Sequence, residues 1–424
     1  MITATTDLQT LGRNARKASR SLARLPGRVK DEALRNVADG LRSRSDEILE
    51  ANAKDTDAGR RDGLSDSILD RLLLNPERLA ALAEDVLAVA ALPDPLGESF
   101  DVRQLPNGLR VGKRRVPLGV VGAIYENRPN VTVDISVLCL KSGNAVILRG
   151  GREAINSNTA LAGLVQNGIA EAGVPGDAVQ FVESTDRALV GEMLKMKDHI
   201  DLVIPRGGSD LVRRVAAEAT MPAITGGIGV CHAYIDRTAD VDKAVAIAHD
   251  AKVSRPSVCN ALDTVLVHSA IAPAFLPKLA EEWGRSGVEI RCDRRALSIL
   301  GSVDRRALTP VSDDDWGTEF LSLTAAVRVV DSLDEALEHI STYGSGHTDL
   351  IVTEDYSAAN RFLDEVDSGV VMVNVSTRFN DGGQLGLGAE VAISTNKMHA
   401  RGPMGLKELT SYKWTVQGNG QIRT

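Results

Sequence analysis

The stretch Leu118–Tyr125, with the sequence LGVVGAIY, decides the fold class because it is the first of several short apolar segments that alternate with helical patterns. Three further strand-like segments follow it along the chain: Ala145–Leu148, Ala178–Val182 and Ile200–Ile204. Strands and helices that alternate in this way form a parallel sheet with helices on both faces. The central part of the chain therefore predicts an α/β fold.

Helical patterns separate these strands and also fill the N-terminal part of the chain. Over residues 5–92, apolar side chains recur at spacings of three and four, which is typical of amphipathic helices. Another helix is expected over Thr159–Ala172, with Asn158 as its N-terminal cap and Gly173 beyond its end. Between the two helical regions, the alternating residues of Asp101–Pro117 predict a hairpin.

The alternation of strands and helices resumes after Gly226-Gly227, which predicts a second α/β unit over about residues 231–390. Its strand candidates are Cys231–Ile235, Leu262–His268, Ala326–Val330, Asp349–Val352 and Val370–Val373. A helix is expected over Leu333–Ser341, and a short strand over Tyr412–Val416 near the end of the chain.

Composition narrows the class of protein. The chain has 424 residues, enough for two or three domains of ~150 residues. Its formal net charge of −8 argues against a nucleic-acid partner, which needs a basic surface. Neither a signal-peptide core nor a long apolar run that could span a membrane is visible. The four cysteines are scattered without a C-x-x-C pair, which suits a reducing compartment, so we expect a cytoplasmic protein.

Two glycine-rich turns follow strand candidates and could bind a nucleotide. They are Arg149-Gly150-Gly151-Arg152 and Arg206-Gly207-Gly208-Ser209. Each alone is more simply interpreted as a tight turn. As a pair with arginines they predict a dinucleotide site, because N–H groups at a helix start attract phosphate and glycine permits close approach. The common nucleotide-binding and zinc-protease motifs are missing, and no metal site is predicted.

Cys259 lies in the segment Ser254–Asn260, a proline-containing loop just before the strand Ala261–His268. From composition alone, a buried and inert cysteine is the commoner interpretation. Cys139, within the apolar run Ile135–Leu140, is expected to lie in the core.

Several longer motifs carry a resemblance to a known family. They are Pro117–Gly122, Glu126–Thr132, Ser254–Asn260, Ser376–Glu390 and Ala400–Leu406. Together they resemble the γ-glutamyl phosphate reductases, or glutamate-5-semialdehyde dehydrogenases, of the aldehyde dehydrogenase superfamily, over roughly residues 8–416. The resemblance implies an aldehyde dehydrogenase-like fold with three parts. These are a Rossmann-like NADP-binding domain (1–99 and 117–230), an α/β catalytic domain (231–404) and a small β oligomerisation arm (100–116 and 405–424).

The resemblance also implies roles for individual residues. Cys259 occupies the position of the catalytic nucleophile, and Asn130 is the candidate for the oxyanion-hole amide. The implied cofactor-binding residues are Arg149, Arg152, Gly207, Ser209 and Glu319, with Glu319 at the nicotinamide ribose. The implied substrate-binding residues are Arg128, Arg255 and Arg378, each of which could otherwise form a surface or interdomain ion pair.

The implied activity is NADPH-dependent reduction of L-glutamyl 5-phosphate to L-glutamate 5-semialdehyde and phosphate, in proline biosynthesis. NADP(H) is expected because Arg149 and Arg152 suit a 2′-phosphate, although Glu153 could favour a free 2′-hydroxyl. The family further implies a homo-oligomer and points to a transient contact with glutamate 5-kinase.

Two alternative functions remain. A hydrolytic aldehyde dehydrogenase would need a carboxylate base beside Gly226-Gly227, where this chain carries Thr225. A catalytically silent NADP-binding scaffold would lack the cysteine or the cofactor turns, and both are present.

Overall fold

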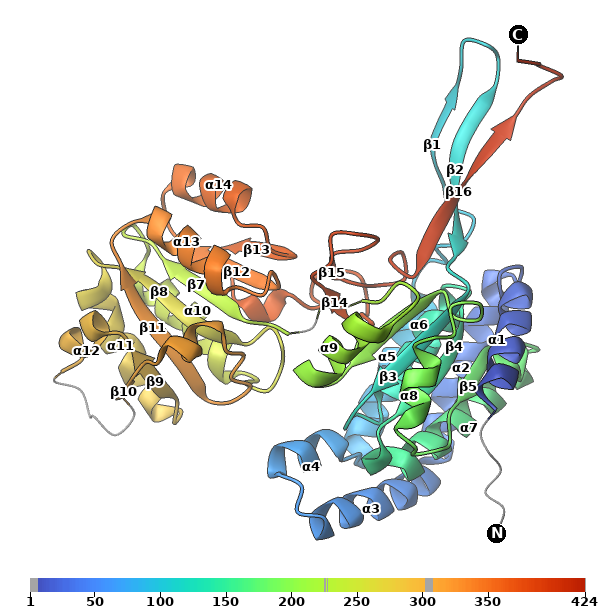
Figure 1. Ribbon diagram of the computed structural model, residues 1–424, viewed down its shortest axis with the longest axis horizontal. Coiled ribbons are helices and arrows are strands. Elements are labelled where there is room, and N and C mark those ends of the chain that lie inside the picture. Colours follow the sequence, from blue (N-terminus) through green and yellow to red (C-terminus); the bar gives the residue numbers. More distant parts are fainter. Residues whose placement is uncertain (1–6, 225, 227, 302–307, 424) are drawn as a thin grey trace. The chain divides into compact units, whose positions relative to one another are not determined.

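The computed structural model describes residues 7–224, 226, 228–301 and 308–423, and its contacts divide the chain into two units (Figure 1). The first unit comprises Met1–Thr225, Gly386–Ala392 and Met404–Thr424. The second comprises Gly226–Leu385 and Ile393–Pro403. Within the described residues, the helices are too short or too polar to cross a membrane.

Five helices open the first unit and confirm the helical prediction for the described part of residues 5–92. They are α1 (Leu8–Leu22), α2 (Gly27–Ser43), α3 (Ser45–Arg61), α4 (Asp66–Leu72) and α5 (Pro76–Ala91). Side-chain caps set some of their starts: the Asp7 carboxylate accepts from the N–H of Gln9, and the Asn75 side chain accepts from the N–H of Arg78. The apolar face of α2 is buried through Leu34, Val37 and Leu41.

A four-stranded parallel sheet forms the centre of the first unit, in the order β5-β4-β3-β6. Its strands are β3 (Val120–Tyr125), β4 (Ala145–Gly150), β5 (Val179–Phe181) and β6 (Leu202–Arg206). The helical segments that accompany it are α6 (Val131–Lys141), η1 (Arg152–Ala154), α7 (Ile155–Glu171), η2 (Gly176–Ala178), α8 (Ala188–Met193) and α9 (Ser209–Glu218). Tyr125 pairs with Gly150 on one side and Arg206 on the other, so both glycine-rich turns leave the sheet at the same edge.

The start of α7 differs from the prediction, because Asn158 is not its cap. The helix begins earlier, at Ile155, and its N-terminal N–H groups are satisfied by a carboxylate from α3. Asp55 accepts from the N–H of Asn156 (3.2 Å) and of Ser157 (2.7 Å). Asn158 lies inside the helix, fully buried, and accepts a hydrogen bond from the hydroxyl of Thr132 (3.0 Å). A cap supplied from 101 residues away along the chain leaves no local signal.

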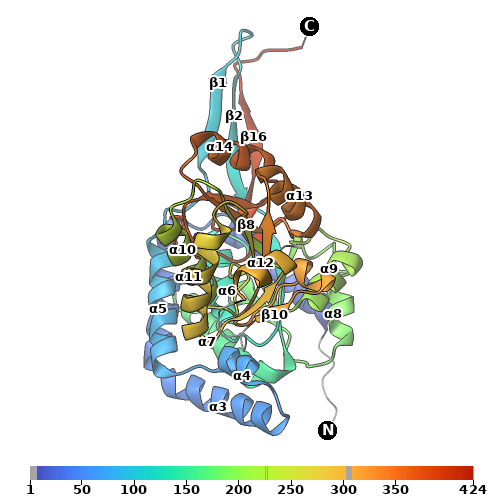
Figure 2. The ribbon, with the colours of Figure 1, turned by 90° about the vertical axis from the view of Figure 1, so that its left-hand side faces the viewer.

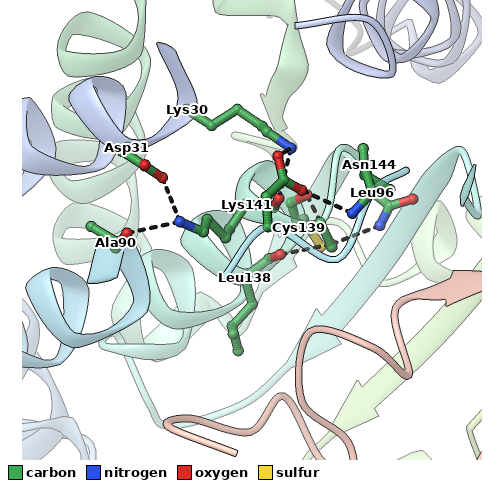
Figure 3. A network of polar contacts seen from close by, with 10 residues as sticks. Lys30, Asp31, Ala90, Leu96, Leu138, Cys139, Lys141 and Asn144 are labelled. Atoms are coloured by element: carbon green, nitrogen blue, oxygen red, sulfur yellow. Dashed lines mark hydrogen bonds and ion pairs between the residues drawn. The ribbon is translucent and has the colours of Figure 1, made fainter. Parts of the chain in front are cut away.

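Two buried lysines connect the helices of the first unit. Lys30 on α2 lies 2.5 Å from the carboxylate of Asp94 and donates to the carbonyl of Lys141 (3.1 Å). Lys141, the last residue of α6, donates to Asp31 and to the carbonyl of Ala90 (2.7 Å), as Figure 3 shows. Both ammonium groups are hydrogen-bonded, and they join α2, α5 and α6.

A three-stranded antiparallel arm also belongs to the first unit and extends away from its four-stranded sheet (Figures 1 and 2). Its strands are β1 (Ser99–Gln104), β2 (Arg110–Pro117) and β16 (Thr410–Gln417). They confirm the predicted hairpin and the C-terminal strand. Tyr412 and Trp414 of β16 are 48% and 55% exposed, and the Lys113 ammonium lies over both rings.

A seven-stranded parallel sheet forms the second unit, in the order β10-β9-β11-β8-β7-β12-β13. Its strands are β7 (Cys231–Ile235), β8 (Leu262–His268), β9 (Glu289–Cys292), β10 (Leu308–Pro310), β11 (Thr324–Val330), β12 (Thr348–Val352) and β13 (Val370–Val373). The other elements are α10 (Val241–Val253), α11 (Ala272–Arg285), α12 (Arg294–Ile299), η4 (Asp313–Gly317), α13 (Leu333–Tyr343), α14 (Tyr356–Glu365), η5 (Thr377–Phe379), β14 (Ile393–Ser394) and β15 (Gly402–Pro403).

Helices cover both faces of this sheet, as the alternation predicted. Ala233 and Ile235 pack into a core with α10 and α11, whereas Tyr234, between them on the strand, packs into a separate core with α13 and α14. The sequence did not predict β9 and β10, because charged residues interrupt β9 and β10 has only three residues. Cys292 lies in β9 and is buried.

Candidate active site

Cys259 is the most accessible of the four cysteines, all of which lie in the described part of the chain. It is partly exposed in the loop between α10 and β8, whereas Cys139, Cys231 and Cys292 are buried. Burial raises the pKa of the Cys139 and Cys231 thiols well above the ordinary value, and that of Cys292 to about 12. These three cysteines therefore stay protonated near neutral pH and are poor nucleophiles.

The Cys259 loop, Ser254–Asn260, is held by residues of the motif Ser376–Glu390. Asn260 is buried, and its side chain donates to the carbonyl of Asn380 (2.9 Å). The hydroxyl of Thr377 donates to the carbonyl of Asn260 (2.6 Å), and the Arg378 guanidinium donates to its side-chain oxygen. Two segments more than 100 residues apart thus form one structure around Cys259.

Of the predicted substrate-binding arginines, Arg255 lies within this loop and Arg378 lies beside it. Arg378 is half-buried and donates to the hydroxyl of Ser254 (3.2 Å). Burial lowers the pKa of Arg378, the positive charge of Arg255 lowers it further, and Cys259 acts in the opposite direction. Arg378 is therefore close enough to interact electrostatically with both Arg255 and Cys259.

Glu319 also approaches the Cys259 loop, through Gly229. Its carboxylate accepts from the N–H of Gly229 (2.9 Å). A side chain at Gly229 would lie 1.7 Å from the carbonyl oxygen of Cys259, so only glycine permits this approach. The second unit thus brings together Cys259, Arg255, Arg378 and Glu319. Thr225, the position at which a hydrolytic aldehyde dehydrogenase would carry its carboxylate base, lies outside the described residues.

The first unit holds the remaining predicted residues. Arg149, at the end of β4, is only 7% exposed, and its guanidinium donates to the carbonyls of Gly150 (2.9 Å), Thr185 (3.3 Å) and Asp186 (3.3 Å). Its donors thus support the loop after β5. Arg152 is exposed in η1.

Arg187 is a candidate cofactor-binding residue that the sequence analysis did not identify. It is exposed on the loop that Arg149 supports. Burial lowers the pKa of Arg149, the charge of Glu153 opposes that effect, and the positive charge of Arg187 lowers the pKa further. The sequence signal that could have identified Arg187 is a basic residue in a polar loop directly after a short strand.

Gly207 and Ser209 flank the start of α9, which has no side-chain cap. The N–H of Gly208, between them, donates to the carboxylate of Glu126 (3.2 Å). A side chain at Gly207 would lie 2.5 Å from that carboxylate. The first N–H groups of α9 lack partners within the helix, which is the arrangement that binds a phosphate.

The turn after β3 contains two asparagines, Asn127 and Asn130. The side chain of Asn130 donates to Asp134 on its own helix (2.8 Å), and burial raises the pKa of Asp134 to about 7. Asn127 has a positive φ of 51°, and its N–H donates to Glu153 (2.7 Å). No hydrogen bond from its side chain is found among the described residues. Arg128 lies between them and is partly exposed.

Known proteins resemble this chain over nearly its whole length. Residues 3–294 match the aldehyde dehydrogenase family. The γ-glutamyl phosphate reductase of Dehalococcoides mccartyi is 58% identical over 98% of both chains, and that of Roseiflexus castenholzii is 54% identical over 99% of this chain and 100% of the relative. The crystal structure of the Thermotoga maritima γ-glutamyl phosphate reductase is 44% identical, covers 98% of this chain and 100% of its own, and superposes with a TM-score of 0.94. The chain therefore belongs to the aldehyde dehydrogenase family and, within it, to the γ-glutamyl phosphate reductases.

Proposed function

We propose that this enzyme reduces L-glutamyl 5-phosphate to L-glutamate 5-semialdehyde and phosphate with NADPH, a step of proline biosynthesis. The observation that carries the proposal is an accessible cysteine flanked by two arginines, in a chain 58% identical to a curated γ-glutamyl phosphate reductase. An acyl phosphate needs both features, because the thiolate attacks the carbonyl while cations hold the leaving group.

Cys259 is the nucleophile in this proposal. Its thiolate attacks the γ-carbonyl carbon, the bond from that carbon to the phosphate oxygen breaks, and a thioester remains. Arg255 and Arg378 suit the departing phosphate, since guanidinium groups bind phosphate through two parallel hydrogen bonds. The backbone N–H of Cys259 serves as a donor to the oxyanion, and one such donor contributes about 3 kcal/mol to the transition state.

A second, side-chain donor to the oxyanion is assigned to Asn130, with Asn127 as the competing candidate. The Asn130 amide already donates a hydrogen bond to Asp134. Asn127, in contrast, has a positive φ, which is often found at strained functional positions. Comparing kcat for Asn127→Ala and Asn130→Ala decides between them, because loss of the true donor lowers kcat by ~10²-fold or more. Arg128 is assigned to the α-carboxylate of the substrate.

The aldehyde dehydrogenase family uses a nicotinamide cofactor, and we assign NADP(H) to this enzyme. Arg152 and Arg187 are exposed near the carboxyl ends of β4 and β5, where their charges suit a 2′-phosphate. The Glu153 carboxylate accepts from the N–H of Asn127, which argues against its competing role at a free 2′-hydroxyl. Gly207 and Ser209 at the start of α9 would hold the pyrophosphate, and Glu319 the nicotinamide ribose.

When bound, NADPH supplies the hydride that reduces the thioester carbonyl. The protein's part is to hold the acyl group on Cys259 and to release the thiol when the semialdehyde forms. Arg149 orients the loop of Arg187 through the carbonyls of Thr185 and Asp186.

The phosphate requirement of the reverse reaction tests this proposal. Purified enzyme is given glutamate 5-semialdehyde and NADP, and NADPH formation is followed by absorbance with and without inorganic phosphate. We expect a single acylation and then a stall without phosphate, since water is a poor acceptor without a positioned base, which contributes about 10²–10⁴-fold. Steady NADPH formation in phosphate-free buffer, with free glutamate as the product, would favour the hydrolytic dehydrogenase instead.

The arm is assigned to assembly. The exposed Tyr412, Trp414 and Val416 lie on β16, an edge strand of the β1-β2-β16 sheet, and such edges pair readily with another chain. We assign the enzyme to the cytoplasm as a homo-oligomer that meets glutamate 5-kinase transiently. Light scattering of Trp414→Glu, compared with the unaltered chain, tests the role of the arm through the loss of the oligomeric mass.

A further inference from the structure

Lys252 is completely buried in the second unit. It lies near the end of α10, and its side chain is 0% exposed. Its ammonium lies 3.6 Å from a carboxylate oxygen of Asp263 and 5.9 Å from the centre of the Phe320 ring. Within the part of the chain that the structure describes, the ammonium makes no hydrogen bond. Burial lowers the pKa of Lys252, and the charge of Asp263 opposes that effect.

Asp263 on β8 links this lysine to two backbone N–H groups. One carboxylate oxygen accepts from the N–H of Phe320 (3.1 Å), and the other from the N–H of Cys231 (3.3 Å). Burial raises the pKa of Asp263 to about 6, while Lys252, the two N–H groups and His232 act to lower it. The ionised carboxylate is the stronger acceptor at both oxygens, since protonation turns one of them into a hydroxyl that donates and accepts only weakly.

Both N–H groups belong to segments that hold the nucleophile loop. The Cys231 thiol, which stays protonated, donates to the carbonyl of Cys259 (3.2 Å). Glu319, next to Phe320 in the chain, accepts from Gly229, whose backbone packs directly against the same carbonyl. The carboxylate of Asp263 therefore connects to the Cys259 peptide group from two sides.

We propose that Lys252 and Asp263 are positioning residues of the reaction: their buried ion pair fixes the Cys259 loop and the Glu319 loop relative to each other without touching the substrate. This inference rests on the proposed function in taking Cys259 as the nucleophile. Stability alone explains the pair poorly, because a buried ion pair is often no better than apolar side chains of similar size, and an ammonium without hydrogen bonds is worse.

The test replaces Lys252 by methionine, which has a similar length and no charge. We expect the acid side of the kcat profile to move upward by about one pH unit, because the pKa of Asp263 rises once the neighbouring positive charge is removed. In the pH range where Asp263 is protonated, kcat falls about tenfold while the KM for the acyl phosphate stays unchanged, since the substrate contacts are intact. Lys243→Met is the matched control, because Lys243 lies exposed on the same helix and pairs with Glu354.

A second variant covers the case in which Lys252→Met fails to fold. The double substitution Lys252→Met with Asp263→Asn removes both charges, so no charge is left unpaired. We expect this protein to fold and to lose the Asp263-dependent step from its pH profile. The rate at which iodoacetamide alkylates Cys259, measured without substrate, should also change in both variants, because the loop geometry changes.

Each possible result either supports or overturns the positioning role of Lys252 and Asp263. An acid side that stays at its original pH in folded Lys252→Met, with only a lower Tm, overturns the positioning role. So does failure of both variants to fold, since the pair is then purely structural. If the unaltered enzyme does not use glutamyl phosphate but the variants alter Cys259 alkylation, the positioning role holds and the proposed substrate falls.

Discussion

The two units bury lysines in opposite ways. In the first unit, Lys30 and Lys141 are each 1% exposed, and each pairs with a carboxylate and donates to a backbone carbonyl (Figure 3). In the second unit, Lys252 is 0% exposed and has the Asp263 carboxylate at 3.6 Å but no hydrogen bond within the described residues. A satisfied buried network stabilises its helices, whereas an unsatisfied one lowers stability and points to a role in chemistry. We therefore expect the Lys30 and Lys141 network to govern the stability of the fold, and the Lys252–Asp263 pair to govern turnover.

Cys259→Ser should show the largest effect, a loss of turnover without a loss of stability. The variant should lose turnover by about 10³-fold or more, because a serine hydroxyl is a far weaker nucleophile than a thiolate. Its unfolding midpoint in urea should stay unchanged, since Cys259 is partly exposed. Cys139→Ala is the mirror control, with normal turnover and a packing cost of about 1–3 kcal/mol. Near-normal activity of Cys259→Ser would overturn the assignment of Cys259 as the nucleophile.

Lys141→Met should show the opposite pattern. It removes the ammonium that pairs with the partly exposed Asp31 and donates to the carbonyl of Ala90, so we expect the free energy of unfolding to fall by about 1–3 kcal/mol. The kcat per folded molecule should remain unchanged. Urea denaturation and active-site titration measure the two quantities. Lys54→Met, which removes an exposed ion pair with Glu50, is the control and should cost less than about 0.5 kcal/mol. A loss of kcat in folded Lys141→Met would show that the lysines of the first unit also affect turnover, and would contradict the contrast between the two units.

Arg187→Ala should have a smaller effect, confined to cofactor choice. Removing one charge-assisted contact to a 2′-phosphate is expected to lower kcat/KM for NADPH about tenfold and to leave that for NADH unchanged. Arg60→Ala, an exposed arginine paired with Asp57 on α3, serves as the control. An equal loss with both cofactors would mean that Arg187 acts on the fold or on the shared part of the dinucleotide.

Local patterns determined the elements of this chain well. The predicted strands Cys231–Ile235, Leu262–His268 and Val370–Val373 coincide with β7, β8 and β13. Apolar runs between glycine and polar residues fix such strands, because both faces of a parallel sheet are buried. The motif Ser254–Asn260 identified the nucleophile candidate, since motif and loop lie in one continuous segment.

What the sequence did not reveal is supplied by partners that are distant along the chain. The cap of α7 comes from Asp55 on α3, and the donors of Arg149 are taken by carbonyls after β5. The pairing of Lys252 with Asp263, and the contact of Asp263 with Phe320, likewise appear only after folding. The sequence by itself determined most of the elements, the family and the candidate nucleophile, because these depend on local periodicity and contiguous motifs. Only the tertiary structure decided which charges are buried together, since a hydrogen bond depends on positions in space and not on order along the chain.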